Sequence, residues 1–168
     1  MTLIKDVMNK GVVTTGAEDT LLVAAKKMVD HGIGCLIVDS GEQLGVVTEQ
    51  DFLKFIVNDR RDVMEVKVSE IMTSPAITGT PEMNIYEASQ VMQEHGFRRL
   101  PIAVEGRLVG IVTQTDLNQA LREDTIREMR AKLDELSRVN LGNTDKAAEI
   151  EQLESAIEEI EGSGPAQA

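Results

Sequence analysis

The sequence contains an internal duplication, and this feature limits the possible folds more than any other. At a shift of 64 residues the identities are Met8/Met72, Thr14/Thr78, Glu18/Glu82, Ala24/Ala88, Met28/Met92, His31/His95, Gly32/Gly96 and Leu36/Leu100. One residue is then inserted, and at a shift of 65 the identities continue with Gly45/Gly110, Val47/Val112, Thr48/Thr113 and Asp51/Asp116. A copy of about 55 residues is marginal on its own. We therefore expect both copies to share one core around a pseudo-twofold axis.

Each copy predicts the element order β-α-β-β-α, an α/β (α+β) fold. Short strands at 12–14 and 76–78 lead into helices whose apolar residues recur at helical spacing. Asn84 and Glu87 form a capping-box pattern at the start of the second of these helices, and Gly32 and Gly96 provide the helix ends. Strands at 35–38 and 44–48 follow in one copy, and strands at 100–104 and 107–113 in the other. The predicted domains are repeat 1 at 1–65 and repeat 2 at 66–121, which together form one module.

Composition excludes several classes of function. The net charge is −12 and the pI about 4.6, so sequence-independent binding to nucleic acid, or binding to anionic lipid, is not expected. No apolar stretch approaches the ~20 residues that span a bilayer, and the N-terminus lacks the apolar region of a secretory signal. Cys35 is the single cysteine and lies in an apolar run, which indicates a buried strand thiol. We expect a cytoplasmic protein.

The segment after residue 121 has a different character. Apolar residues at helical spacing predict two short amphipathic helices within 122–161, separated by a turn at 140–143 and with Thr144 or Asp145 as the second cap. Isolated helices of this length are marginal in water. They could fold back as an antiparallel hairpin, pair with a second molecule or bind an effector protein. Residues 162–168 are expected to be disordered.

The phrase T-x-x-D follows the last strand of each copy, at Thr48–Asp51 and Thr113–Asp116. Such a Thr can cap the helix that begins there, and the Asp can bond back to the Thr backbone. The same geometry can serve a nucleotide, because a Thr hydroxyl can donate to a phosphate and a carboxylate can accept from two ribose hydroxyls. Spacing alone leaves both interpretations open.

The duplication and its repeated phrases resemble a tandem pair of CBS domains, the family named after cystathionine β-synthase, whose paired unit is called a Bateman module. The resemblance rests on D-V-M and E-I-M, on D-H-G and E-H-G-F-R-R-L-P, and on G-h-V-T-x-x-D in both copies. It covers about residues 2–121 and leaves the tail out. It implies two clefts between the repeats that bind adenosine-containing ligands such as AMP, ADP, ATP or S-adenosylmethionine.

The resemblance also assigns site residues, with each cleft completed by the opposite repeat. The Asp51 cleft would comprise Thr48, Asp51, Ser74, Pro75, Ala76, Ile77, Phe97, Arg98 and Arg99. The Asp116 cleft would comprise Lys10, Gly11, Val12, Val13, Ile33, Gly34, Cys35, Thr113, Thr115 and Asp116. Arg98 and Arg99 make the Asp51 cleft the expected site for a phosphorylated nucleotide. The Asp116 cleft would be empty or take a less charged adenosyl ligand. A solvated arginine pair is the alternative.

No catalytic arrangement is found in the sequence. There is no P-loop and no nucleophile paired with a base, and His31, His95 and Cys35 do not form a metal set of ordinary spacing. We therefore expect a non-catalytic regulatory module that signals occupancy through conformation or oligomerisation, with no catalytic cofactor. A homodimer is implied by the resemblance. The alternative is a ligand-independent dimerisation scaffold in which the T-x-x-D phrases are only caps.

Overall fold

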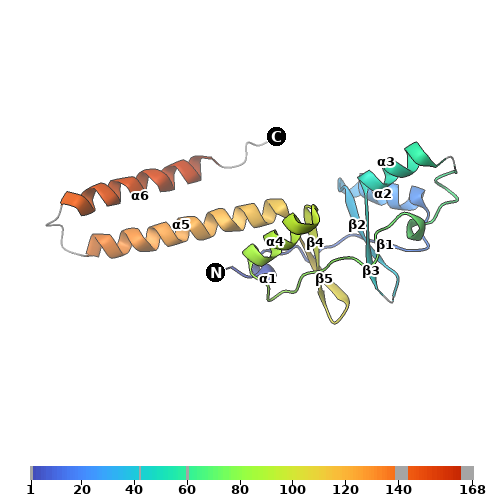
Figure 1. Ribbon diagram of the computed structural model, residues 1–168, viewed down its shortest axis with the longest axis horizontal. Helices are drawn as coiled ribbons and strands as arrows, with labels where there is room; N and C mark the ends of the chain where they lie inside the picture. The colour runs from blue at the N-terminus through green and yellow to red at the C-terminus, as the bar shows by residue number, and fades with distance from the viewer. Residues whose placement is uncertain (1, 42, 60, 139–143, 164–168) are drawn as a thin grey trace.

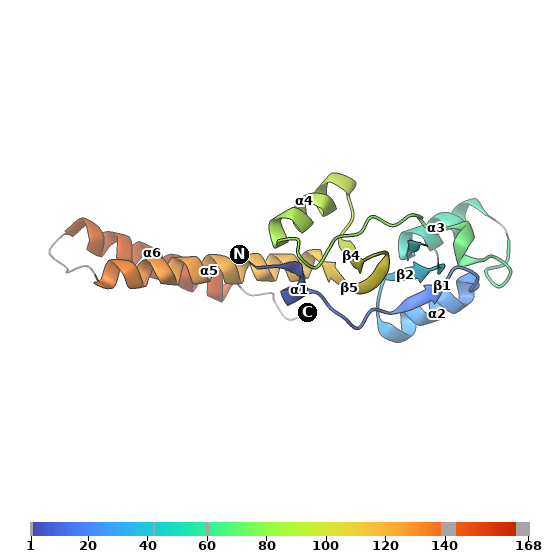
Figure 2. The same ribbon diagram turned by 90° about the horizontal axis from the view of Figure 1, so that it is seen from below.

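The computed structural model describes residues 2–41, 43–59, 61–138 and 144–163, of which 144–146 are described by backbone alone. The molecule is elongated, with the two repeats side by side at one end and a helical hairpin projecting from the second repeat (Figure 1). The view turned by 90° shows the same order, from the α2–α3 end through the β4–β5 sheet to the hairpin (Figure 2). The fold is mixed α/β, as predicted.

The first repeat contains a three-stranded sheet covered by two helices. Its elements are β1 (Thr14–Gly16), α2 (Leu21–His31), β2 (Cys35–Asp39), β3 (Leu44–Thr48) and α3 (Glu49–Asn58). Strand β1 is parallel to β2, which is antiparallel to β3. The strand predicted at 12–14 lies instead at 14–16, because the parallel pairing begins at Thr14 opposite Ile37.

The second repeat differs in one element. It contains α4 (Ile85–His95), β4 (Arg99–Val104), β5 (Arg107–Thr113) and α5 (Gln114–Arg138), and β4 and β5 form a two-stranded sheet. The prediction of a strand at 76–78 was wrong. The chain before it pairs with the first repeat, since the Ala76 N–H donates to Leu44 O and Val46 exchanges two hydrogen bonds with Thr73. What remains beside β4 is a single parallel bridge at Gly79.

The two repeats interlock through their leading segments. Helix α1 (Ile4–Val7) inserts Ile4 into the core of the second repeat, and Asn9 bridges to Ile111 of β5. In return, Val66 and Val68, which flank and begin the short 3₁₀ helix η1 (Val68–Glu70), pack into the core of the first repeat. A third apolar cluster joins the sheets of both repeats; its buried members are Cys35, Ile37, Leu44 and Ala103. Each repeat thus has a core of its own, and this smaller cluster joins them in place of the single shared core expected from the duplication.

The predicted ends of α2 and α4 and the predicted start of α4 are confirmed. Gly32 and Gly96 cap α2 and α4 in the left-handed conformation, with φ of 61° and 70°, a region that glycine enters without steric cost. Asn84 accepts hydrogen bonds from the first turn of α4, while Glu87 bonds back to the Asn84 backbone. These end signals are local, so they act the same way in any tertiary setting.

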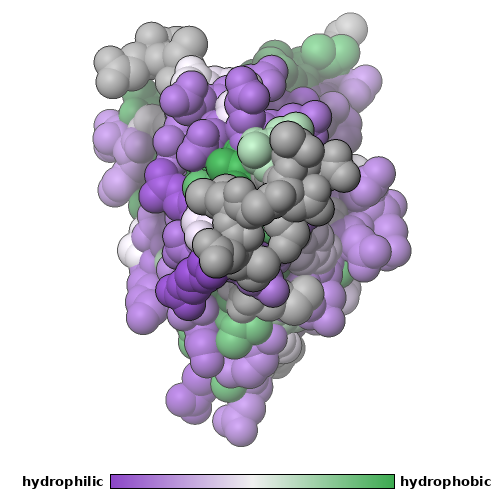
Figure 3. Space-filling model, turned by 90° about the vertical axis from the view of Figure 1, so that its left-hand side faces the viewer, coloured by the Kyte–Doolittle hydropathy of each residue, from purple (hydrophilic) through white to green (hydrophobic). Residues whose placement is uncertain are grey.

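The C-terminal segment is an antiparallel hairpin of α5 and α6 (Thr144–Gly162) (Figure 1). Ion pairs link the two helices from Lys132 to Glu149 and from Arg130 to Glu161, each at 2.6 Å, and Ile157 is buried. Seen from the hairpin end, the surface is largely hydrophilic (Figure 3). Of the helices that the structure describes, none is both long and apolar enough to cross a membrane.

Two expectations for this segment need correction. The tail helix is not separate, because α5 runs for 25 residues without interruption from the last strand of the second repeat. No glycine or proline occurs between Gln114 and Arg138, so nothing ends the helix near residue 121. Gly162 belongs to α6 rather than to a disordered end. The predicted turn at 140–143 and the end at 164–168 lie outside the described residues.

Candidate functional site

The two T-x-x-D junctions have the same geometry and both cap their helices. Asp51 Oδ2 accepts from the Thr48 N–H at 2.9 Å and from the Thr48 hydroxyl at 2.6 Å. Asp116 Oδ2 accepts from the Thr113 N–H at 2.8 Å and from the Thr113 hydroxyl at 2.7 Å. In each junction the same carboxylate oxygen is used, and Oδ1 has no hydrogen bond to any described residue. Capping therefore leaves half of each carboxylate open to a ligand.

This geometry changes the role expected of the threonines. Each hydroxyl has one proton and donates it to the neighbouring carboxylate, so it can accept from a ligand but cannot also donate to a phosphate. Donors for a phosphate must therefore come from other residues. Arginine is the side chain best suited to this task.

A cleft with a volume of about 390 Å³ lies beside Asp51. Eight of the nine residues predicted for it line the cleft: Thr48, Asp51, Pro75, Ala76, Ile77, Phe97, Arg98 and Arg99. Ser74 does not, and its buried hydroxyl has no hydrogen-bond partner among the described residues. The lining residues that sequence reasoning missed are Cys35, Val46, Thr73, His95 and Pro101. The volume is within the ~300–1,000 Å³ typical of small-molecule sites.

Polar and apolar groups converge in this Asp51 cleft. Prolines, Ala76 and Ile77 form an apolar wall, and the rings of His95 and Phe97 are stacked with centroids 5.7 Å apart. The side chains of Arg98 and Arg99 are exposed and form no ion pair or hydrogen bond with any residue that the structure describes. Arg61, Arg127 and Arg130, by contrast, each pair with a carboxylate. The cleft thus combines an open carboxylate, two available guanidinium groups and an apolar wall.

A second, smaller cleft of about 230 Å³ lies beside Asp116. Of the residues predicted for it, Gly11, Val12, Val13, Ile33, Cys35, Thr113 and Asp116 line it. Lys10, Gly34 and Thr115 do not, and Lys10 and Thr115 are exposed elsewhere. The lining residues that the sequence did not indicate are Asn9, Ile37, Arg99 and Ile111. Arg99 was assigned only to the Asp51 cleft, whereas the structure places it in both.

Gly34 is covered by an acidic side chain instead of facing the cleft. A Cβ at Gly34 would stand 2.6 Å from Glu49 Oε2, and the Glu49 N–H donates to Gly34 O at 3.1 Å. In the second repeat the equivalent backbone bond runs from Gln114 to Arg98, but the Gln114 side chain bonds along its own helix to Asn118. The shift of 65 residues aligns Glu49 with Gln114, so this difference in charge was available in the sequence.

The Cys35 thiol is buried between the two clefts. Burial raises the pKa of this thiol to about 11, while the nearby charge of Arg99 acts in the opposite direction and Asp51 adds to the increase. The thiol is therefore neutral at physiological pH. This agrees with the expectation of a buried strand thiol, and such a thiol is expected to be inert.

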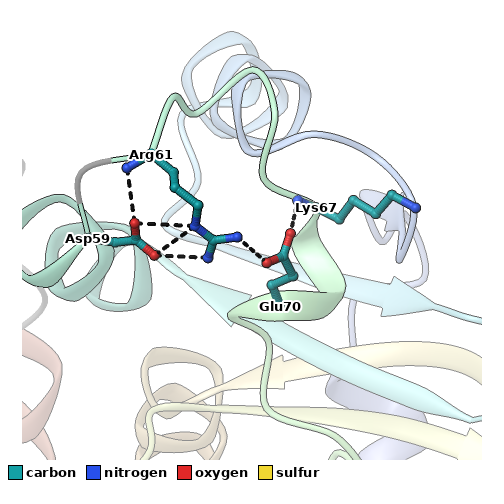
Figure 4. Close-up of polar contacts among 4 residues, drawn as sticks. All are labelled: Asp59, Arg61, Lys67 and Glu70. Carbon is teal, nitrogen blue, oxygen red and sulfur yellow. Dashed lines mark hydrogen bonds and ion pairs between the residues drawn. The ribbon is translucent and has the colours of Figure 1, made fainter.

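The link between the repeats carries a charge cluster outside both clefts (Figure 4). Arg61 bonds to Asp59 and to Glu70, and Glu70 also accepts from the Lys67 backbone. These carboxylates raise the pKa of Arg61. Arg61 is thus bound to acidic side chains, and the neighbouring Arg60 lies outside the described residues. Among the residues described, no group of three or more His, Cys, Asp or Glu side chains could hold a metal ion.

Comparisons with known proteins agree with this architecture. The CBS domain family matches residues 4–58 and 68–123. CBS domain-containing protein YhcV of Bacillus subtilis is 36% identical over 118 residues, which cover 70% of this chain and 84% of that protein. Protein MK0525 of Methanopyrus kandleri is 35% identical over 119 residues, 69% of this chain but only 61% of its own length.

A solved structure shows the same fold with ligands. The CBS domain pair of protein MJ0100, in complex with 5′-methylthioadenosine and S-adenosyl-L-methionine, aligns with a TM-score of 0.65 and 26% identity. The alignment covers 74% of this chain and 98% of that one. With two family matches that together span most of the sequence, the chain belongs to the CBS domain family and contains a tandem CBS pair.

Proposed function

We propose that this chain is a regulatory module that binds a phosphorylated adenosine, such as AMP, ADP or ATP, in the Asp51 cleft and does no chemistry on it. CBS pairs are regulatory modules in general, and one structural relative is a complex with two adenosyl compounds. The observation that carries the proposal for this cleft is the placement of Arg98 and Arg99. In a chain of net charge −12, both guanidinium groups lack partners among the described residues and line one cleft with Asp51.

Different residues of the cleft lining suit the ribose, the phosphate and the base of the ligand. The Thr48 bonds use Oδ2 of Asp51 and leave Oδ1 available. This Oδ1 accepts hydrogen bonds from the ribose hydroxyls. The arginines hold the phosphate through charge-assisted hydrogen bonds. The apolar wall at Pro75, Ala76 and Ile77 suits the face of a purine.

The Asp116 cleft is proposed to take a less charged adenosyl ligand, such as S-adenosylmethionine, or none. It is smaller, and Arg99 is its one cationic residue among those described. Asp116 has the same capping geometry and the same open oxygen as Asp51, so it offers the same ribose contact. The difference between the clefts therefore lies in their charge rather than in their ribose sites.

Occupancy of the Asp116 cleft can reach the hairpin directly. Asp116 lies in the first turn of α5, and this helix of 25 residues runs to the far end of the hairpin, a total length of about 37 Å at 1.5 Å per residue. A ligand can shift the equilibrium between two positions of this helix only to the extent that it binds one position more tightly than the other. The hairpin is the proposed contact for an effector protein.

Self-association is proposed through the outer face of α3. Leu53, Ile56 and Val57 are 63%, 61% and 81% exposed on this helix. Their equivalents in α5 are Asn118, Leu121 and Arg122, and Arg122 bonds to Ser163 at the end of α6. The apolar face of α3 has no such cover among the described residues, which favours a homodimer. The same face supports the alternative function, a dimerisation scaffold without a ligand. A cytoplasmic location remains part of the proposal.

Calorimetric titration with AMP, ADP, ATP, adenosine and S-adenosylmethionine tests the proposal. We expect the phosphorylated ligands to bind one strong site per chain, and Asp51→Ala and Arg98→Gln to weaken it while Asp116→Ala does not. If Asp116→Ala abolishes nucleotide binding and the other two variants leave it unchanged, the site assignment is wrong. If no ligand in the panel binds at millimolar concentration while the protein is dimeric, the scaffold function is correct instead.

A further inference from the structure

Two residues border both clefts, and they are equivalent positions of the internal repeat. Cys35 begins β2 and Arg99 begins β4, and a shift of 64 residues relates them. Each lines the Asp51 cleft and the Asp116 cleft. They therefore form part of the wall between the clefts. The repeat symmetry is broken here in charge, because one position has a thiol and the other a guanidinium group.

The two clefts depend on Arg99 to different degrees. The Asp51 cleft has Arg98 in addition, whereas among the described residues that line the Asp116 cleft Arg99 is the one cation. Cys35 cannot replace that charge, and the Glu49 carboxylate lies on Gly34, between two residues that line the Asp116 cleft. Without Arg99, the charge of the Asp116 cleft is set by carboxylates.

Arg99 is also able to turn toward either side. Its side chain is exposed and has no hydrogen bond or ion pair with a described residue. The guanidinium group is a rigid planar fork on a flexible stem, so directing its donors to a phosphate on one side of the wall removes them from the other side. A single arginine cannot serve two phosphates in separate clefts at full strength.

We propose that Arg99 is a cation shared by the two clefts, so that a phosphorylated adenosine in the Asp51 cleft disfavours a second one in the Asp116 cleft, which then admits an uncharged adenosine nucleoside. The proposal rests on the function proposed for the Asp51 cleft. By linkage the antagonism is mutual, and an effect of about tenfold is within the range of ordinary coupling between sites. It applies to anionic ligands and leaves the affinity for adenosine unchanged.

Single-cleft variants of the full chain separate the two roles of Arg99. In an Asp51→Ala background the Asp116 cleft remains, and Arg99→Gln should weaken AMP binding by about tenfold. Arg98→Gln is the matched control and should have no effect there, because Arg98 lines only the Asp51 cleft. In an Asp116→Ala background, both arginine variants should weaken AMP binding. Within each background, the arginine variants should keep the adenosine affinity of their parent variant, which also shows that they are folded.

The unmodified protein provides the second measurement. After saturation with AMP at the strong site, a titration with adenosine should still show one site per chain, and further AMP should bind about tenfold more weakly than it binds the Asp51→Ala variant. Two equal and independent AMP sites, or an Arg99→Gln effect confined to the Asp51 cleft, would overturn the shared cation but not the proposed function. Failure of both AMP and adenosine to bind the unmodified protein contradicts both proposals.

Discussion

Asp51 is expected to have two separable roles, as a helix cap and as a ribose acceptor. Thr48→Ala removes the hydroxyl bond at 2.6 Å but leaves the carboxylate in place, still held by the backbone N–H of position 48. Asp51→Ala removes both the cap and the ligand contact. Comparing the two variants therefore distinguishes a structural role from a binding role.

The magnitudes are far enough apart to measure. Loss of an N-terminal cap costs about 1 kcal/mol of folding free energy, which lowers the melting temperature of a chain of this size by about 2–4 °C. A ligand at one hundred times its Kd stabilises the folded state by about 2.7 kcal/mol, or about 5–11 °C. Both variants should lose the first amount, and only Asp51→Ala should also lose the second.

Thermal unfolding with and without AMP, followed by circular dichroism, is the assay. Thr113→Ala and Asp116→Ala are the matched controls, since they remove the same cap in the second repeat and should keep the AMP-induced increase. The reasoning is refuted if Asp51→Ala keeps the full increase in melting temperature with AMP. It is also refuted if Thr48→Ala loses the increase as completely as Asp51→Ala does.

Three further predictions concern charge, the thiol and association. Hydrogen bonds from Thr15 and Lys27 lower the pKa of Asp19 to about 2, so Asp19→Asn should lower the free energy of unfolding by about 1 kcal/mol at pH 7. Denaturation curves should show this difference between the variant and the unmodified protein fading as the pH falls from about 4 to 2. A difference independent of pH contradicts the assigned pKa. Alkylation of Cys35 should accelerate up to about pH 11, its pKa, and Arg99→Gln should shift the profile upward, whereas a plateau near pH 8 would show an unburied thiol. Ile56→Glu should convert a dimer to a monomer in analytical ultracentrifugation, and an unchanged mass would exclude α3 as the interface.

Much of each repeat was predictable because its signals are local. Gly32, Gly96 and the T-x-x-D phrases set helix ends through bonds within four residues, and the structure has them as expected. The strand at 76–78 failed for a non-local reason. The preceding residues pair with β3 of the other repeat, which the pattern of one segment cannot show. The continuity of α5 was missed although the absence of glycine and proline indicated it.

The site was predictable to a similar extent. The residues of the Asp51 cleft follow from the family resemblance, and eight of the nine line one cleft. The shared position of Arg99 could not be read from the chain, because it depends on how the pseudo-twofold axis brings the starts of β2 and β4 together. The contact of Glu49 with Gly34 is a matter of side-chain direction, which spacing does not determine.

A crystal structure of the chain with millimolar AMP tests the central proposal most directly. We predict the nucleotide in the Asp51 cleft, with ribose hydroxyls within hydrogen-bond distance of the Asp51 carboxylate, the phosphate on Arg98 and Arg99, and the base against the wall at Pro75 and Ala76. An Asp51 cleft that stays empty at that concentration, or AMP bound with its phosphate away from both arginines, would contradict it.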